Sequence, residues 1–337
     1  MLTPPEAAAP HELGAPDDQR GSHLSVRGAR SIEGRSPWRL AFERLRRDRL
    51  SLVALGVILL IVLVAIFAPL IAKGTGHGVY TQYPTTGLTP TGLPRAPSSA
   101  FPLGTDDLGR TLLVRIAYGA RVSLLVGVLA TLMTVTIGAA LGLVAGYFGK
   151  LVDTLIARAV DVMLSIPFLL FAIALASVVS VTPLHLGPLT LGKGIPIVVL
   201  VIGIFSWATV ARIVRGQVIA IRSREYIEAA RALGASSWRI IVFDVLPNVL
   251  PTIIVYATLL IPVSIVAEAA LSYLGVGIPP PTADWGSMIA DAQSYYQQAW
   301  WFLTFPSLAL LMTTLAFNIL GDGVRDAIDP RGTPFKS

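Results

Sequence analysis

Long apolar runs separated by charged segments set the pattern of this chain. Six runs contain no Asp, Glu, Lys or Arg, and each is long enough to cross a hydrocarbon layer of about 30 Å as a helix. In lipid a backbone must satisfy its own hydrogen bonds, so these runs are predicted to be helical, and Trp207 is expected to mark the interfacial end of the fourth. The predicted spans are Leu50–Ala72, Val122–Gly149, Val162–Val181, Ile195–Ala211, Val249–Ala267 and Phe302–Leu320.

The segment before the first span is predicted to form an interfacial elbow helix over residues 36–49. Its sequence SPWRLAFERL offers Ser36 as N-cap and Pro37 at the first helical position. Residues 1–35 are rich in Pro, Gly, Ala, Asp and Arg without apolar periodicity, so we interpret them as a flexible tail. Residues 73–116 are predicted to form an external loop and an amphipathic segment, and residues 117–324 a core of spans two to six.

Composition agrees with a membrane protein and narrows the chemistry. Hydrophobic residues make up 54% of the chain and charged residues 14%, against about a quarter charged in a soluble domain. There is no cysteine, which excludes disulfides and thiol chemistry, and the four histidines have no metal-ligand spacing. A formal charge of +6 is also typical of nucleic-acid binding, but its placement favours membrane topology.

The distribution of Lys and Arg predicts the orientation of the spans. The N-terminal segment ends in RLAFERLRRDRL, which the positive-inside rule places in the cytoplasm. With six spans, residues 325–337 and the segment between spans four and five are then cytoplasmic, and Gly275–Trp301, which has no Lys or Arg, is external. Arg110, Arg115 and Arg121 disagree, because they precede span two on the external side. An amphipathic helix along the outer surface, with these side chains snorkelling to the headgroups, is expected there.

The segment between spans four and five, residues 224–248, reads REYIEAARALGASSWRIIVFDVLPN. Tyr226, Ile227, Ala230 and Leu233 are predicted to share one face of a helix. The following GASS should end that helix, because Gly is a common helix terminator and Ser a good cap, and a second short basic helix is predicted over Trp238–Val245. Small residues and one acid suit a helix that docks into a partner's groove. The alternative is a loop lying on the bilayer surface.

Further candidates lie in and after the spans. Glu268 is costly at the end of an apolar run, and it either lines a translocation pathway, pairs with a partner subunit, or orients the external loop. Tyr273, Asp284 and Trp285 belong to an aromatic interface belt or to an outer gate that meets a binding protein. Gly138, Gly142 and Gly146 fall four residues apart, which predicts close helix packing.

Several motifs resemble one family. Residues 228–230 read EAA and are followed at the expected spacing by Gly234 and by VLP at 245–247, which resembles the EAA loop of type I ABC importer permeases. GTDDLGRTLLVRIAYGARVSLLVG, EAALSYLGVGIPPPTADWGSMIADA and LGDGVRDAIDPR are similar to stretches of the dipeptide/oligopeptide/nickel permease subunits, as is the elbow with its first span. The resemblance covers Ser36 to Arg331. Thr111, Val114 and Asp244 depart from the family pattern.

The resemblance implies an all-α permease with six transmembrane helices and a cytoplasmic coupling helix, in a bacterial cell membrane with both termini cytoplasmic. It implies that the chain translocates di- or oligopeptides. The implied partners are a homologous second permease in a heterodimer, two cytoplasmic ATPases that bind ATP and Mg, and an external solute-binding protein that delivers the peptide. This chain itself would bind no cofactor and catalyse no reaction. Alternatives are an importer of nickel or another small solute, a secondary transporter or channel working alone, and a membrane scaffold or receptor. The residues implied in ATPase coupling are Glu228, Ala229, Ala230, Arg231, Gly234, Ala235, Trp238, Leu246 and Pro247.

Overall fold

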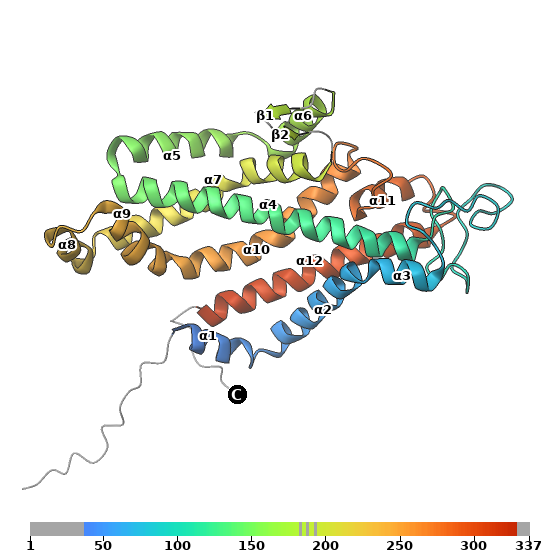
Figure 1. Cartoon of the computed structure of the whole chain (residues 1–337), viewed down its shortest axis with the longest axis horizontal. Helices are drawn as coiled ribbons and strands as arrows, with labels where there is room; N and C mark the ends of the chain where they lie inside the picture. The colour runs from blue at the N-terminus through green and yellow to red at the C-terminus, as the bar shows by residue number, and fades with distance from the viewer. Residues whose placement is uncertain (1–36, 182–183, 187–188, 192–193, 329–337) are drawn as a thin grey trace, which may run out of the picture. The chain divides into compact units, whose positions relative to one another are not determined.

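The computed structural model of the protein describes residues 37–181, 184–186, 189–191 and 194–328, and these are almost entirely helical (Figure 1). The described part of the chain contains one small antiparallel hairpin, β1 Leu184–Leu186 with β2 Leu189–Leu191, which the all-α prediction did not include. The helices are α1 Pro37–Leu45, α2 Arg49–Ile66, α3 Ala68–Thr75, α4 Leu112–Phe148, α5 Lys150–Ser165, α6 Phe168–Val181, α7 Ile195–Arg222, α8 Glu225–Ala232, α9 Ser237–Arg239, the π-helix η1 Ile240–Val245, α10 Leu246–Tyr273, α11 Trp285–Ala292 and α12 Trp300–Ile328.

The elbow helix is confirmed as α1, which starts at Pro37. The predicted flexible tail 1–35, the cap at Ser36 and residues 329–337 of the predicted C-terminal segment lie outside the described residues.

The two most extensively packed helices, α4 and α7, run parallel. A Cβ placed on Gly138 would lie 2.6 Å from Cβ of Val210, and one on Gly146 would lie 2.6 Å from Cβ of Val218. Position numbers therefore rise together along the two helices. Glycine at these positions lets the helix axes approach closely, which confirms the predicted packing role of this motif.

Two parallel neighbours require the chain to return between them, and α5 with α6 makes that return. Among the described residues five helices are long and apolar enough to cross a membrane, and there are six if the pair α5–α6, bent by 87°, is counted as one span. The bend falls at Ile166-Pro167, because proline disfavours helical geometry in the residue before it, and Ile166 is extended with ψ 124°. The predicted third span, Val162–Val181, therefore covers only part of the returning segment.

The remaining helices alternate in direction. On α4 and α10, Ser123 contacts Glu268 and Thr131 contacts Ser264, so these helices are antiparallel. On α2 and α12, Ser51 packs against Gly323, while residues nearer the other end of α2 pack against earlier residues of α12. The start of α2, the end of α12 and α8 consequently lie at one end of the bundle, called the α8 end, and α3 and α11 lie at the other, called the α11 end (Figure 1).

Helix boundaries differ from the predicted spans, most clearly in the first, second and fourth runs. α4 begins at Leu112 rather than Val122, and α7 continues to Arg222 instead of ending at Ala211. The first run is divided at Phe67 into α2 and α3, where Pro69 occupies the first turn of α3. Trp207 does not mark the end of α7; it is 8% exposed and packs against residues of α4 and α5.

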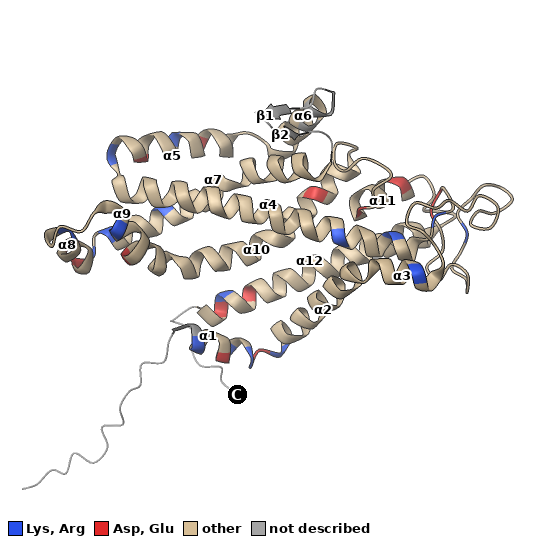
Figure 2. Cartoon of the chain, in the orientation of Figure 1, with Lys and Arg blue, Asp and Glu red and all other residues tan. Residues whose placement is uncertain are grey.

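The predicted second basic helix is not separate. Its residues form α9 and η1, and these run directly into α10 without a break in the helical backbone. Asn248 donates its side-chain N–H to the carbonyl of Asp244 at 2.6 Å across this junction. Most charged residues lie toward the two ends of the bundle, apart from some on α5, α7 and α10 (Figure 2).

Candidate functional site

At the α8 end, a short helix and a tight turn project between the long helices α7 and α10. The carbonyl of Arg224 accepts from the backbone N–H groups of Ile227 and Glu228 at 3.0 and 3.2 Å, which starts α8. Gly234 ends the turn after α8 with φ +81°, a conformation that glycine adopts without steric cost. Ser236 then caps α9 by accepting from the N–H of Arg239. The predicted helix–GASS–helix boundary is therefore confirmed.

One face of α8 is anchored on the long helices. Ile227 is fully buried in a core cluster that includes Tyr147 of α4 and Val218 of α7. The guanidinium of Arg231 lies 5.3 Å from the centre of the Tyr147 ring, a favourable cation–π distance. Arg222, in the last turn of α7, donates to the carbonyl of Gly146 at 2.9 Å. The segment is thus held in a defined position on α4 and α7.

The predicted apolar face of α8 is only partly buried within this chain. Ile227 and Ala230 pack inward, whereas Tyr226 is 47% exposed and Leu233 is 88% exposed. Trp238, beyond the turn, is 72% exposed. Leu233 to Trp238, here called the exposed turn, therefore presents two large apolar side chains around glycine and small polar residues. An exposed apolar patch of this kind is typical of an interaction surface.

The other predicted coupling residues divide between surface and core. Asp244 joins no ion pair among the described residues, and Arg239 lies 6.0 Å from the centre of the Phe243 ring, so contact of either residue with a partner stays a prediction. Of the residues implied in ATPase coupling, those exposed at the α8 end are Glu228, Ala229, Arg231, Gly234, Trp238 and Pro247. Those half-buried and packed on the core cluster are Ala230, Ala235 and Leu246.

At the α11 end, the predicted pathway residue Glu268 is fully buried within this chain. Its carboxylate accepts from the hydroxyls of Ser123 at 2.8 Å and Ser272 at 3.0 Å. Ser272 in turn accepts from the N–H of Ile278, which fixes the start of the connection to α11. Glu268 therefore joins α4, α10 and this connection, and a role in a translocation pathway stays a prediction.

Asp284 caps α11 next to this group. Its carboxylate accepts from the N–H of Ser287 at 2.9 Å and from the hydroxyl of Ser287 at 2.6 Å. Burial raises the pKa of Asp284 above its usual range. Trp285 is 1% exposed and donates its indole N–H to the carbonyl of Ile116 at 3.2 Å, so it is a core residue rather than part of an interface belt. Tyr273 is partly exposed, and its hydroxyl contacts the Gln293 side chain.

The arginines that disagreed with the positive-inside rule are mostly buried, which corrects the expected surface helix. Arg110 and Arg115 are 6% and 3% exposed. Both contact the carboxylate of Asp106, Arg110 at 2.6 Å and Arg115 at 3.3 Å. Arg121 alone is exposed, 5.6 Å from the centre of the Tyr118 ring. Asp106 lies four positions before Arg110 and nine before Arg115, and this spacing was the signal in the sequence that a paired cluster was possible.

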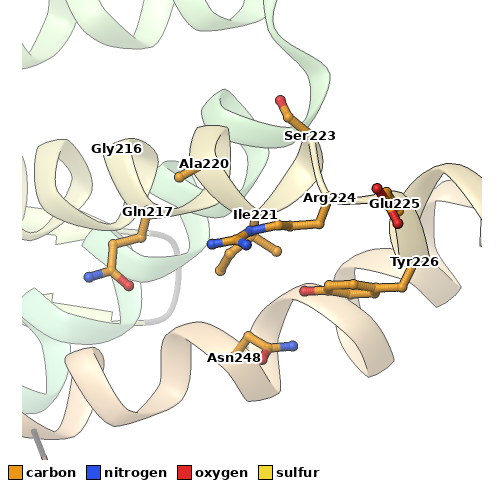
Figure 3. A pocket seen from close by; sticks show the side chains of 9 residues that line it. All are labelled: Gly216, Gln217, Ala220, Ile221, Ser223, Arg224, Glu225, Tyr226 and Asn248. Atoms are coloured by element: carbon orange, nitrogen blue, oxygen red, sulfur yellow. The ribbon is translucent and has the colours of Figure 1, made fainter. Parts of the chain in front are cut away.

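A groove opens beside α8, with a volume of about 1010 Å³, between the last turns of α7 and the first turn of α10 (Figure 3). Within the described residues, no group of three or more His, Asp or Glu side chains is placed to hold a metal ion. The residues that line the groove are Gly216, Gln217, Ala220, Ile221, Ser223, Arg224, Glu225, Tyr226 and Asn248.

This architecture can be compared with known proteins. The family described as binding-protein-dependent transport system inner membrane component matches residues 138–333, which include α7, the exposed turn and α10. The N-terminal TM domain of oligopeptide transport permease C matches residues 36–90. The chain belongs to this transport family. It is therefore an integral membrane permease subunit of a binding-protein-dependent, ABC-type importer.

Curated relatives match the permease over most of its length. The dipeptide transport system permease protein DppC of Alkalihalophilus pseudofirmus is 40% identical over 88% of this chain and 90% of its own. The oligopeptide transport system permease protein OppC of Bacillus subtilis is 38% identical over 88% and 90%. The glutathione transport system permease protein GsiD of Pectobacterium atrosepticum is 37% identical over 88% and 92%.

A solved structure supports the fold of the permease. A chain of the MetNI methionine ABC transporter, in an inward facing conformation, aligns with a TM-score of 0.51 and 20% identity, covering 63% of this chain and 96% of that chain. At that identity the likeness shows the fold alone, which is the type I ABC importer permease fold predicted from the motifs.

Proposed function

We propose that this permease moves di- or oligopeptides across a bacterial cell membrane. Relatives that cover nearly nine-tenths of the chain are named for the transport of dipeptides, oligopeptides and glutathione. The proposed orientation places the α8 end, with both chain termini, in the cytoplasm and the α11 end outside. Its support is the arginine-rich elbow at the α8 end and the absence of Lys and Arg from residues 275–301 at the α11 end.

The assembly that we propose has three kinds of partner. A second, homologous permease completes a heterodimer, two cytoplasmic ATPases bind ATP and Mg, and an external solute-binding protein delivers the peptide. This chain is then a non-catalytic subunit that holds no cofactor. The sequence supports this division, because it contains no G-x-x-x-x-G-K-[ST] loop with which to cradle nucleotide phosphates.

The exposed turn is the proposed contact with an ATPase. It combines two large exposed apolar side chains, Leu233 and Trp238, with a glycine that permits close approach. Because α8 is anchored on α4 and α7 through Ile227 and Arg231, a force applied at the turn would move those helices with it. In this scheme the permease is the bistable element, and ATP binding on the partners biases its equilibrium between inward-facing and outward-facing states.

The substitution Leu233→Arg tests this proposal. Leu233 is 88% exposed, so a charge there leaves the fold intact, with stability changed by no more than about 0.5 kcal/mol, yet it places a solvated cation in an apolar contact. We expect co-purification of the ATPases and peptide uptake to fall at least about tenfold, with an unchanged thermal midpoint. Gly234→Arg is a poorer test, because its φ of +81° would strain any side chain.

The matched control is Leu50→Arg, which adds the same charge at a 70% exposed leucine at the start of α2, also at the α8 end. Uptake by that variant should stay close to wild type. Normal ATPase association by Leu233→Arg would refute the coupling role of the turn. Transport of peptide by the purified chain without any ATPase would refute the importer assignment itself.

A further inference from the structure

The groove beside α8 carries chemistry that the coupling role does not use. It lies between the last turns of α7 and the first turn of α10, next to the exposed turn but lined by different side chains. Figure 3 shows the guanidinium of Arg224, the phenol of Tyr226 and the amides of Gln217 and Asn248 directed into one space, whereas the carboxylate of Glu225 points away. A cation and neutral polar groups thus converge on the groove, and the carboxylate of the neighbouring Glu225 points away from it.

The cation of this group is not neutralised within the described chain. Arg224 starts α8 through its backbone, and none of the ion pairs formed by the described residues involves its side chain. Arg222, two residues earlier, is by contrast committed to the carbonyl of Gly146. A guanidinium that faces a groove without an acid partner presents planar donors suited to a carboxylate.

The two amides have defined free groups. Gln217 accepts from the hydroxyl of Thr252 at 3.1 Å through its carbonyl oxygen, which leaves its NH₂ group free to donate into the groove. Asn248 donates its NH₂ group to the carbonyl of Asp244, which leaves its own carbonyl oxygen free to accept. The groove therefore offers a cation, donors on Gln217 and Tyr226, and one acceptor on Asn248.

The nonpolar wall adds a size and shape requirement. Gly216 and Ala220 lie one turn apart on α7, and Ile221 supplies the one large aliphatic side chain among the residues that line the groove. A Cβ built on Gly216 meets nothing within 4 Å, so the space beside it is open. A short aliphatic group can lie against this wall while a charged end reaches Arg224.

We infer that the groove binds the carboxyl-terminal end of a peptide at the α8 end of the permease. The terminal carboxylate pairs with Arg224 and accepts from Tyr226 and Gln217, and the last peptide N–H donates to Asn248. This set distinguishes a peptide from a phosphate group, which carries no N–H for the Asn248 acceptor. The inference rests on the proposed function, because it concerns a peptide that leaves at the cytoplasmic side.

Equilibrium binding of radiolabelled trialanine tests the inference. The probe is added to the complete importer in zwitterionic lipid nanodiscs, without the solute-binding protein. We expect saturable binding in wild type, with trialanine amide competing at least about tenfold less well than the free acid, because the amide cannot form a charge-assisted pair. Arg224→Gln should weaken binding of the acid by a similar factor and abolish the preference for acid over amide.

Two further variants separate the groove from general effects. Arg47→Gln removes an equivalent exposed charge from the connection before α2 and should leave binding unchanged. Gly216→Leu places a side chain in the open space and should block binding, whereas Gly216→Ala should not, since one methyl fills little of the groove and alanine favours a helix interior.

Equal competition by acid and amide, unchanged binding in Arg224→Gln, or no saturable binding in wild type would each overturn the inference. So would loss of trialanine binding in nanodiscs that contain phosphatidylglycerol, because the groove would then be a lipid phosphate site. ATP-driven uptake of trialanine by the same importer in sealed proteoliposomes, with the solute-binding protein added, keeps the two proposals separate. If the wild type imports trialanine but one of these outcomes is found, only the inference about the groove is refuted. If the wild type does not import trialanine, the proposed function is refuted.

Discussion

The two ends of the bundle contrast in burial: charged side chains are buried at one end, and large apolar side chains are exposed at the other. At the α11 end, Asp106, Arg115 and Glu268 are nearly or fully buried and find their partners within this chain. At the α8 end, Leu233 and Trp238 are exposed around a glycine turn and lack such partners. The charges named at the α11 end are thus satisfied within this chain, whereas the apolar side chains named at the α8 end present a surface that a second protein could cover.

This difference separates two meanings of a conspicuous residue in a membrane sequence. A charge beside an apolar run can be structural, because burial without a partner costs several kcal/mol and the fold must provide one. An exposed leucine or tryptophan contributes little to folding, so its place is easier to explain by an interaction. Variants at the α11 end should therefore change stability first, whereas Leu233→Arg should change assembly and leave stability alone.

The largest expected effect is that of Asp106→Ala. Asp106 contacts Arg110 at 2.6 Å and Arg115 at 3.3 Å, and its other oxygen accepts from the N–H of Arg110 at 2.8 Å. Its removal leaves two buried cations without their shared carboxylate, which should cost about 3–5 kcal/mol. The thermal midpoint of the purified protein in detergent measures this. Asp326→Ala, at an exposed position of α12, is the control, and an equal loss in both would remove the contrast between the ends.

A smaller effect is expected for Ser123→Ala. This buried hydroxyl on α4 donates to Glu268 on α10 at 2.8 Å, and hydrogen bonds between membrane helices contribute about 0.5–2 kcal/mol. The midpoint should fall modestly, while ATPase association stays unchanged. Thr136→Ala, an exposed position on the same helix, provides the comparison. A fall in uptake without loss of stability would instead favour the pathway role predicted for Glu268.

The smallest effect, and one of opposite sign, is expected for Asp107→Asn. Burial raises the pKa of Asp107 above 3.8, with the neighbouring charge of Asp106 adding to the rise. A carboxyl whose pKa is raised by folding stabilises the protein below about pH 3.8, and this stabilisation is lost as pH increases through the raised pKa. The asparagine variant should therefore melt slightly higher than wild type at pH 7, and the difference should shrink toward pH 4. A difference that grows on acidification would contradict the sign.

Local patterns predicted much of the fold because they depend on short-range physics. Apolar runs identified the membrane helices, the Gly138-x-x-x-Gly142 spacing predicted the close contact with α7, and the Gly234-Ala-Ser-Ser segment predicted the turn after α8. Boundaries were less accurate, because α4 and α7 extend into charged residues that tertiary contacts satisfy. Arg115, for example, was expected to reach the lipid headgroups. The tertiary structure instead pairs it with Asp106, in the loop before α4.

The exposed turn shows the same limit at the candidate site. Periodicity placed Tyr226, Ile227, Ala230 and Leu233 on one face, but α8 is anchored mainly through Ile227 and Ala230. A helix of two turns buries only the narrow strip that α4 and α7 offer. Neither the exposure of Leu233 nor the groove at Arg224 could be read from spacing, because both depend on where α10 begins relative to α7.

The sequence by itself determined the class of protein, the membrane helices, the glycine contacts and the position of the turn after α8, since each follows from residues a few positions apart. Only the tertiary structure decided that α4 and α7 run parallel, that α5 and α6 together make the return crossing, and which charges are paired. The course of the helices depends on contacts between residues distant in the chain, such as Gly138 with Val210 and Ser123 with Glu268, and no local preference encodes them.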